Sequence, residues 1–171
     1  RPKRKRNDLF FKKAITYPQV SKEFFTAHLP AHILSQVDLT TLKQEKESFI
    51  DTDLKSGIVD VLFSVGTDDK AGYFYLLTEK QATEDRFMPF RIYKYILKIC
   101  DWHLAQHPQS KHLPFVYPFI FYTGQTEYKA PLNLWDLFIN PELAKAIYTN
   151  NFQLVELNKV ADEELIARVW S

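Results

Sequence analysis

The fold is decided by residues 58–81, which read IVDVLFSVGTDDKAGYFYLLTEKQ. Two runs rich in β-branched and aromatic residues, 58–65 and 72–81, flank a Gly-Thr-Asp-Asp-Lys segment of the kind that forms hairpin loops. This pattern predicts two antiparallel strands joined by a short connection. Each predicted strand carries a carboxylate, Asp60 in the first and Glu79 in the second.

The segments around this hairpin predict an α/β (α+β) fold with a mixed central sheet flanked by helices and with helical additions at the C-terminal end. A helix, three strands, a long helix and a further strand follow one another along the chain. The expected elements are helices from about Asn7 or Asp8, from Pro18 and from Pro30; a polar connection at 39–46; strands at 48–51, 58–65 and 72–81; a helix from about 88 to 106; a strand at 113–122 that Pro118 restricts to an edge or a bulge; a helix after Asn140; a strand at 152–157; and a helix after Asp162.

Composition limits the class of protein. The chain is 46% hydrophobic, which is enough apolar material for one compact core. Its length of 171 residues is too short for two domains that each have a sizeable core. The single cysteine, Cys100, excludes an intramolecular disulfide and a cysteine-based zinc site, which fits the reducing cytoplasm. No apolar run approaches the ~18 residues that cross a membrane, so no membrane partner is expected.

Asp60 is unusual because a carboxylate inside an apolar strand costs several kcal/mol unless it has a partner, a metal or access to water. Glu79 and Gln81 alternate onto one strand face, about 6.6 Å apart. Antiparallel pairing would bring Asp60 beside the end of that strand. Such a set of ligands suits Mg²⁺, with Mn²⁺ as an alternative. The other interpretation is a paired core carboxylate and a solvated strand-end acid.

Eight segments also resemble, in the correct order, the motifs of one family. Segment 24–30 is similar to F-L-x-x-H-L-P, segment 59–65 to S-D-L-L-Y-S-V, and segment 75–81 to Y-L-L-I-E-H-Q. The chain therefore resembles the Rpn family of recombination-promoting nucleases, also described as YhgA-like transposases. The remaining matching segments are 7–14, 48–54, 90–95, 118–124 and 134–138.

This resemblance implies membership of the PD-(D/E)XK nuclease superfamily, with a restriction-endonuclease-like αβββαβ core. It implies that Asp60 and Glu79 bind the metal and act in catalysis. It also implies a catalytic role for Gln81, which stands where the superfamily more often has lysine and would orient water or a phosphate oxygen. Where the family's serines are replaced, lost hydrogen bonds would weaken the site, and three neighbours depart from the family pattern. They are Val59 for serine, Lys80 for histidine and Ala82 for serine.

Further acids are candidates for the same metal site. Asp51 is either an additional metal ligand or the end of the first predicted strand. By resemblance, Asp8 and, as an alternative, Glu23 are candidates for the acidic group that the superfamily supplies from its first helix. These assignments rest on the family pattern, since spacing alone does not choose among them.

Basic residues give the expected DNA contacts. Arg91, Lys94 and Lys98 share one face of the long helix, which often flanks DNA in this superfamily, and Arg4 and Arg6 belong to a basic tail. The alternative is that these cations form an ordinary solvated surface.

The sequence thus predicts an Mg²⁺-dependent, cytoplasmic DNA endonuclease, or an inactive DNA-binding or interaction module derived from one. We expect a basic tail, 1–6, and a single domain, 7–171, that is truncated at its C-terminal end because a helical pattern is cut short there. The oligomeric state is left open, a homo-oligomer included.

Overall fold

The computed structural model describes residues 11, 13–51, 58–67, 70–79 and 85–170, without the side chains of Lys70, Glu79 and Leu165. The chain divides into two compact units, Arg1–Leu132 and Asn133–Ser171. The first unit contains the sheet, and the second contains short helices.

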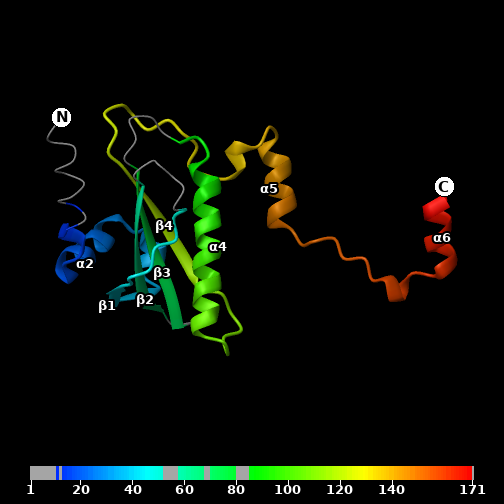
Figure 1. Cartoon of the computed structure of the whole chain (residues 1–171), viewed down its shortest axis with the longest axis horizontal. Coiled ribbons are helices and arrows are strands. Elements are labelled where there is room, and N and C mark those ends of the chain that lie inside the picture. Colours follow the sequence, from blue (N-terminus) through cyan, green and yellow to red (C-terminus); the bar gives the residue numbers. More distant parts are fainter. Residues whose placement is uncertain (1–10, 12, 52–57, 68–69, 80–84, 171) are drawn as a thin grey trace. The chain divides into compact units, whose positions relative to one another are not determined.

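A mixed four-stranded sheet forms the centre of the first unit (Figure 1). Its order is β1 (Val37–Gln44), β2 (Val59–Thr67), β3 (Lys70–Glu79) and β4 (Phe115–Tyr122). β2 runs antiparallel to both β1 and β3, whereas β3 and β4 run parallel and are connected through α4 (Met88–Gln106). This arrangement confirms the predicted fold class, including the order of three strands, a long helix and a strand.

The predicted hairpin is confirmed by a continuous antiparallel register between β2 and β3. It runs from Val59 opposite Thr78 to Thr67 opposite Lys70. Asp60 therefore lies opposite Leu77, two residues before the end of β3. The hairpin register fixes which side chains can meet at this end of the sheet.

The prediction of the first strand was wrong. Residues 48–51 form no strand; β1 occupies Val37–Gln44, in the region expected to be a polar connection. β1 borders only β2 in the described sheet and buries few side chains, Val37, Leu39 and Leu42 being partly buried. An edge strand of this kind needs few apolar residues, so its sequence resembles a loop.

The second unit consists of η1 (Trp135–Leu137), α5 (Pro141–Thr149), η2 (Leu157–Lys159) and α6 (Asp162–Trp170). The two predicted helices are confirmed, and the Asn140 Oδ1 atom accepts a hydrogen bond of 3.1 Å from the backbone N–H of Leu143. The predicted strand at 152–157 was wrong: none of these residues is in a strand, Leu157 begins η2, and the apolar side chains of the segment are exposed.

Two apolar clusters cover the two faces of the sheet, and Figure 1 shows α4 and α2 (Pro18–His28) on opposite sides of it. On the α4 side, Tyr75 and Leu77 of β3 pack with residues of that helix. On the other side, Phe25 of α2 contacts Phe63 and Phe74 at ring-centroid distances of 5.3 and 4.5 Å. The short helix α3 (Ala31–Leu34) adds partly buried residues to this second cluster.

We predict that α4 stabilises the fold through its buried face. Ile99 is fully buried, whereas Leu97 on the same helix is 62% exposed. Ile99→Ala should lower the free energy of unfolding by about 2–5 kcal/mol, because it removes core contacts and leaves a cavity. Leu97→Ala is the matched control and should change it by less than about 1 kcal/mol. If urea denaturation showed that Ile99→Ala and Leu97→Ala lower the free energy of unfolding equally, this packing would be contradicted.

Candidate active site

The Asp60 carboxylate is held by three hydrogen bonds near the start of β2. The Ser48 hydroxyl donates to Oδ1 at 2.6 Å, and the Phe49 backbone N–H donates to Oδ2 at 2.7 Å. The Tyr75 hydroxyl, from β3, also donates to Oδ2 at 2.7 Å. These donors replace the water that the half-buried carboxylate loses on folding, which explains how an aspartate is tolerated in an apolar strand.

Tyr75 is a fixed donor to this carboxylate. Its side chain is fully buried, and this burial, followed by the negative charge of Asp60, raises the pKa of the Tyr75 hydroxyl well above its usual value. The hydroxyl therefore stays protonated at neutral pH, so that it donates to Asp60 throughout.

The segment 48–51 connects this carboxylate to α4. The Phe49 ring contacts Tyr75 edge-on at 6.5 Å and Trp102 of α4 at 5.8 Å. Next to it, the Asp51 carboxylate binds Lys98 Nζ at 2.8 Å and Lys94 Nζ at 3.6 Å. The segment is thus fixed through side chains on both sides, which is why it needs no strand pairing.

Both oxygens of Asp51 face cations of α4. Oδ1 binds Lys98, and Oδ2 lies near Lys94 and, at 3.5 Å, the Tyr95 hydroxyl. The hydrogen bond from Lys98 is the largest cause of a lowered pKa of Asp51, and the same contact raises the pKa of Lys98. An additional metal-ligand role of Asp51 stays a prediction, and any metal would compete with these two lysines.

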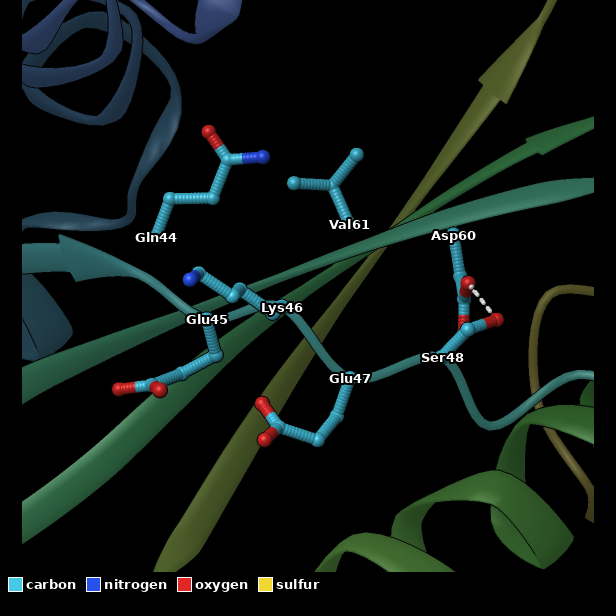
Figure 2. Close-up of a pocket in the computed structure, with 7 residues that line it drawn as sticks. All are labelled: Gln44, Glu45, Lys46, Glu47, Ser48, Asp60 and Val61. Carbon is cyan, nitrogen blue, oxygen red and sulfur yellow. Dashed lines mark hydrogen bonds between the residues drawn. The ribbon is translucent and has the colours of Figure 1, made fainter.

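An open groove of about 440 Å³ begins beside Asp60. Figure 2 shows the Asp60 and Ser48 side chains meeting at one end of it, while Glu45 and Glu47 point away from Asp60. Among the residues that the structure describes, no three His, Cys, Asp or Glu side chains converge to hold a metal ion. The groove is lined by Gln44, Glu45, Lys46, Glu47, Ser48, Asp60 and Val61.

The backbone of Glu79 lies at the same end of the sheet as Asp60. Glu79 is the last residue of β3 and pairs with Tyr122 of β4, two positions beyond Leu77, the partner of Asp60. The Glu79 side chain lies outside the described part of the structure, so the convergence of the predicted metal ligands stays a prediction. The same holds for three sets of predicted site residues that lie wholly outside it: Gln81, Asp8, and Arg4 with Arg6.

The predicted DNA-contacting residues of α4 all bind carboxylates. Arg91 Nε binds Asp85 at 2.9 Å, and Lys94 and Lys98 share Asp51. Lys94, Lys98 and Asp51 together carry one net positive charge. Contact with phosphate at Lys94 or Lys98 would therefore compete with Asp51.

Sequence reasoning missed Tyr75 and Ser48 as partners of Asp60. The signal for Tyr75 was present, because a hairpin that pairs Asp60 with Leu77 places Tyr75 diagonally across from Asp60, within reach of a long side chain. Ser48 had no comparable signal, since its contact depends on the path of the connection after β1. Glu45 and Glu47, which line the groove, were missed for the same reason.

Comparison with known proteins places the chain in a family. The family described as "Putative transposase, YhgA-like" matches residues 5–170, and the chain belongs to it. It is 37% identical to "Recombination-promoting nuclease RpnA" of Escherichia coli (strain K12) over 161 residues, covering 94% of this chain and 54% of that protein.

Two further relatives differ in what their names say about activity. "Recombination-promoting nuclease RpnD" of Escherichia coli O157:H7 is 34% identical, with 94% of this chain and 62% of that protein covered. "Inactive recombination-promoting nuclease-like protein RpnE" of Escherichia coli (strain K12) is 35% identical, with 94% and 53% covered. The chain thus spans 53–62% of the length of the latter two relatives. No solved structure matches the chain.

We predict that the ion pairs of Asp51 make the free energy of unfolding depend on pH in the acidic range. The pKa of Asp51 is held below its ordinary value of 3.8, so the pairs stabilise the folded protein above that pH. This contribution is lost as the pH falls through the lowered, folded-state value. The wild type should therefore unfold at a higher urea concentration than Asp51→Asn near neutral pH, and the difference should shrink steadily as the pH falls below 3.8.

The salt concentration provides a control for this prediction. Asp51 and its lysine partners are partly exposed, so dissolved ions can screen their attraction. The difference between wild type and Asp51→Asn near neutral pH should shrink in about 1 M NaCl, where the screening length is roughly 3 Å. A difference that is the same at every pH, or that grows with salt, would contradict an electrostatic origin.

Proposed function

We propose that the chain contains the catalytic core of a divalent-metal-dependent DNA endonuclease that promotes recombination and acts in the cytoplasm. Support comes from membership of a family whose relatives are named recombination-promoting nucleases. The observation that carries the proposal is the Asp60 carboxylate, which three donors orient beside a groove and next to the end of β3. The finer assignment to the PD-(D/E)XK superfamily belongs to the same proposal.

The donor set fits Mg²⁺ or Mn²⁺. Asp60 provides a fixed carboxylate at the groove, Glu79 is the last residue of the adjacent strand, and Gln81 comes two residues later in the sequence. Because Mg²⁺ is usually held by one or two carboxylates, with water and substrate phosphate as the other ligands, a cluster of three acids is not required. When bound, the ion would activate water and stabilise negative charge on the phosphodiester.

The protein residues supply ligation and orientation. Asp60 and Glu79 would bind the metal, and Gln81 would orient the attacking water or a phosphate oxygen through its amide. Arg91, Lys94 and Lys98 would position the DNA backbone from α4 once phosphate replaces their carboxylate partners.

A second candidate is an inactive DNA-binding or interaction module with the same fold. It is favoured by the similarity to RpnE, whose name describes it as inactive. Val59, Lys80 and Ala82 differ from the family motif around the proposed site and give the same indication. Salt-sensitive DNA binding by the wild type, without cleavage in Mg²⁺ or Mn²⁺, would identify this candidate.

The nuclease proposal predicts that cleavage depends on Asp60. Asp60→Ala should lower the nicking rate of supercoiled plasmid in Mg²⁺ at least about 100-fold, since losing even an outer-shell partner of a metal ligand typically costs ~10–100-fold. Removing Mg²⁺ with a chelator should stop plasmid nicking by the wild-type protein.

The matched control is Asp101→Ala, which removes an exposed carboxylate from α4 and should retain the wild-type rate. Folding of each variant is checked by its unfolding midpoint. Equal nicking by wild type and Asp60→Ala would refute the role of Asp60.

A further inference from the structure

Among the contacts of the described residues, the Asp60 carboxylate has one acceptor position left. An ionised carboxylate offers about four lone-pair directions, two on each oxygen. Oδ2 already accepts from Tyr75 and from the Phe49 N–H, and Oδ1 accepts from Ser48. The remaining direction therefore belongs to Oδ1, on the oxygen that meets Ser48 at the end of the groove (Figure 2).

We propose that Tyr75 is a positioning residue that holds Oδ2 of Asp60, so that a divalent cation binds this carboxylate through Oδ1 alone. The inference rests on the proposed function, because it presumes that Asp60 binds the metal. It adds a residue that acts through Asp60 and defines which carboxylate oxygen binds the ion.

Packing makes Tyr75 suited to this role. Its ring contacts Phe49 at a centroid distance of 6.5 Å and Tyr95 of α4 at 6.3 Å, and its side chain is fully buried. The hydroxyl is thus fixed by the core and not by the carboxylate that it holds. Outer-shell donors with locked side chains are what orient metal ligands in proteins.

Tyr73 offers a matched control on the same strand. It lies two residues before Tyr75, packs in the same cluster and is 4% exposed. Its hydroxyl pairs with Nδ1 of His103 at 2.6 Å and makes no described contact with Asp60. Changing either tyrosine to phenylalanine removes one buried hydroxyl and keeps the ring, but only one of these changes releases Asp60.

The test is a Mn²⁺ titration followed by electron paramagnetic resonance of the free ion, on the wild type, Tyr75→Phe, Tyr73→Phe and Asp60→Ala. Tyr75→Phe should raise the Kd for Mn²⁺ about 10–100-fold, the usual effect of removing an outer-shell partner. Tyr73→Phe should leave Kd within about twofold of wild type, because it has no shared partner with Asp60. In the nicking assay, the half-saturating Mg²⁺ concentration should rise for Tyr75→Phe and not for Tyr73→Phe.

The outcomes separate this inference from the proposed function. If Asp60→Ala abolishes Mn²⁺ binding while Tyr75→Phe binds as the wild type does, only the role of Tyr75 is overturned. If both tyrosine variants weaken binding equally, the effect is general loosening of the core, and the inference also fails. If Asp60→Ala binds Mn²⁺ as tightly as the wild type, the proposed metal site falls as well.

Ser48→Ala keeps the inference testable should Tyr75→Phe fail to fold. Ser48 is exposed, and the change leaves both donors to Oδ2 in place. The Kd for Mn²⁺ should then rise less than about tenfold, the lower end of the usual effect of losing an outer-shell partner, because both donors to Oδ2 still orient the carboxylate. A loss of tenfold or more would make Ser48 the orienting residue in place of Tyr75.

Discussion

A carboxylate in an apolar strand needs hydrogen-bond donors. In this protein the donors to Asp60 join β2 to the neighbouring strand and to the connection after β1. Asp60 receives donors from the neighbouring strand, through Tyr75, and from the connection after β1, through Ser48 and the Phe49 backbone. The same connection continues to Asp51, which binds two lysines of α4. The strands and the connection are therefore held together around Asp60, and a second carboxylate, Asp51, ties the connection to the helix. Leaving the half-buried Asp60 carboxylate without partners would cost several kcal/mol.

The hydrogen bonds that make Asp60 tolerable also determine what it offers to a ligand. In the part of the chain that the structure describes, two donors occupy Oδ2, whereas Oδ1 retains one open direction beside the groove. The negative charge of Asp60 is thus not neutralised by a cation of the described residues, as it would be in a structural ion pair. The carboxylate group is also held in one orientation by its hydrogen bonds. A carboxylate fixed in this way is suited to metal binding, in which ligand geometry is demanding and outer-shell donors set the orientation. Family membership gives this arrangement its proposed use, and the relative named inactive shows that similarity alone does not establish cleavage.

Local patterns predicted the parts of the fold that depend on local chemistry. The β2–β3 hairpin follows from its turn residues, and α4 from its apolar periodicity. β1 was missed because an edge strand buries little, and the strand expected at 152–157 was wrong because apolar residues there find no pairing strand. At the site, the register of the hairpin predicted that Asp60 and Glu79 share one end of the sheet, and it would also have predicted Tyr75. The Ser48 and Asp51 contacts depend on the path of a connection, which no local pattern determines.

The metal-binding role of Asp60 is tested most directly by a crystal structure of the protein with Mn²⁺, located by its anomalous scattering. We expect an ion bound to Oδ1 of Asp60 at about 2.0–2.2 Å, with Glu79 at the same ion and with the Tyr75 and Phe49 hydrogen bonds to Oδ2 intact. An ion on Oδ2 that displaces the Tyr75 hydroxyl would contradict the proposed orientation. The absence of any ion at Asp60 under saturating Mn²⁺ would contradict the metal site itself.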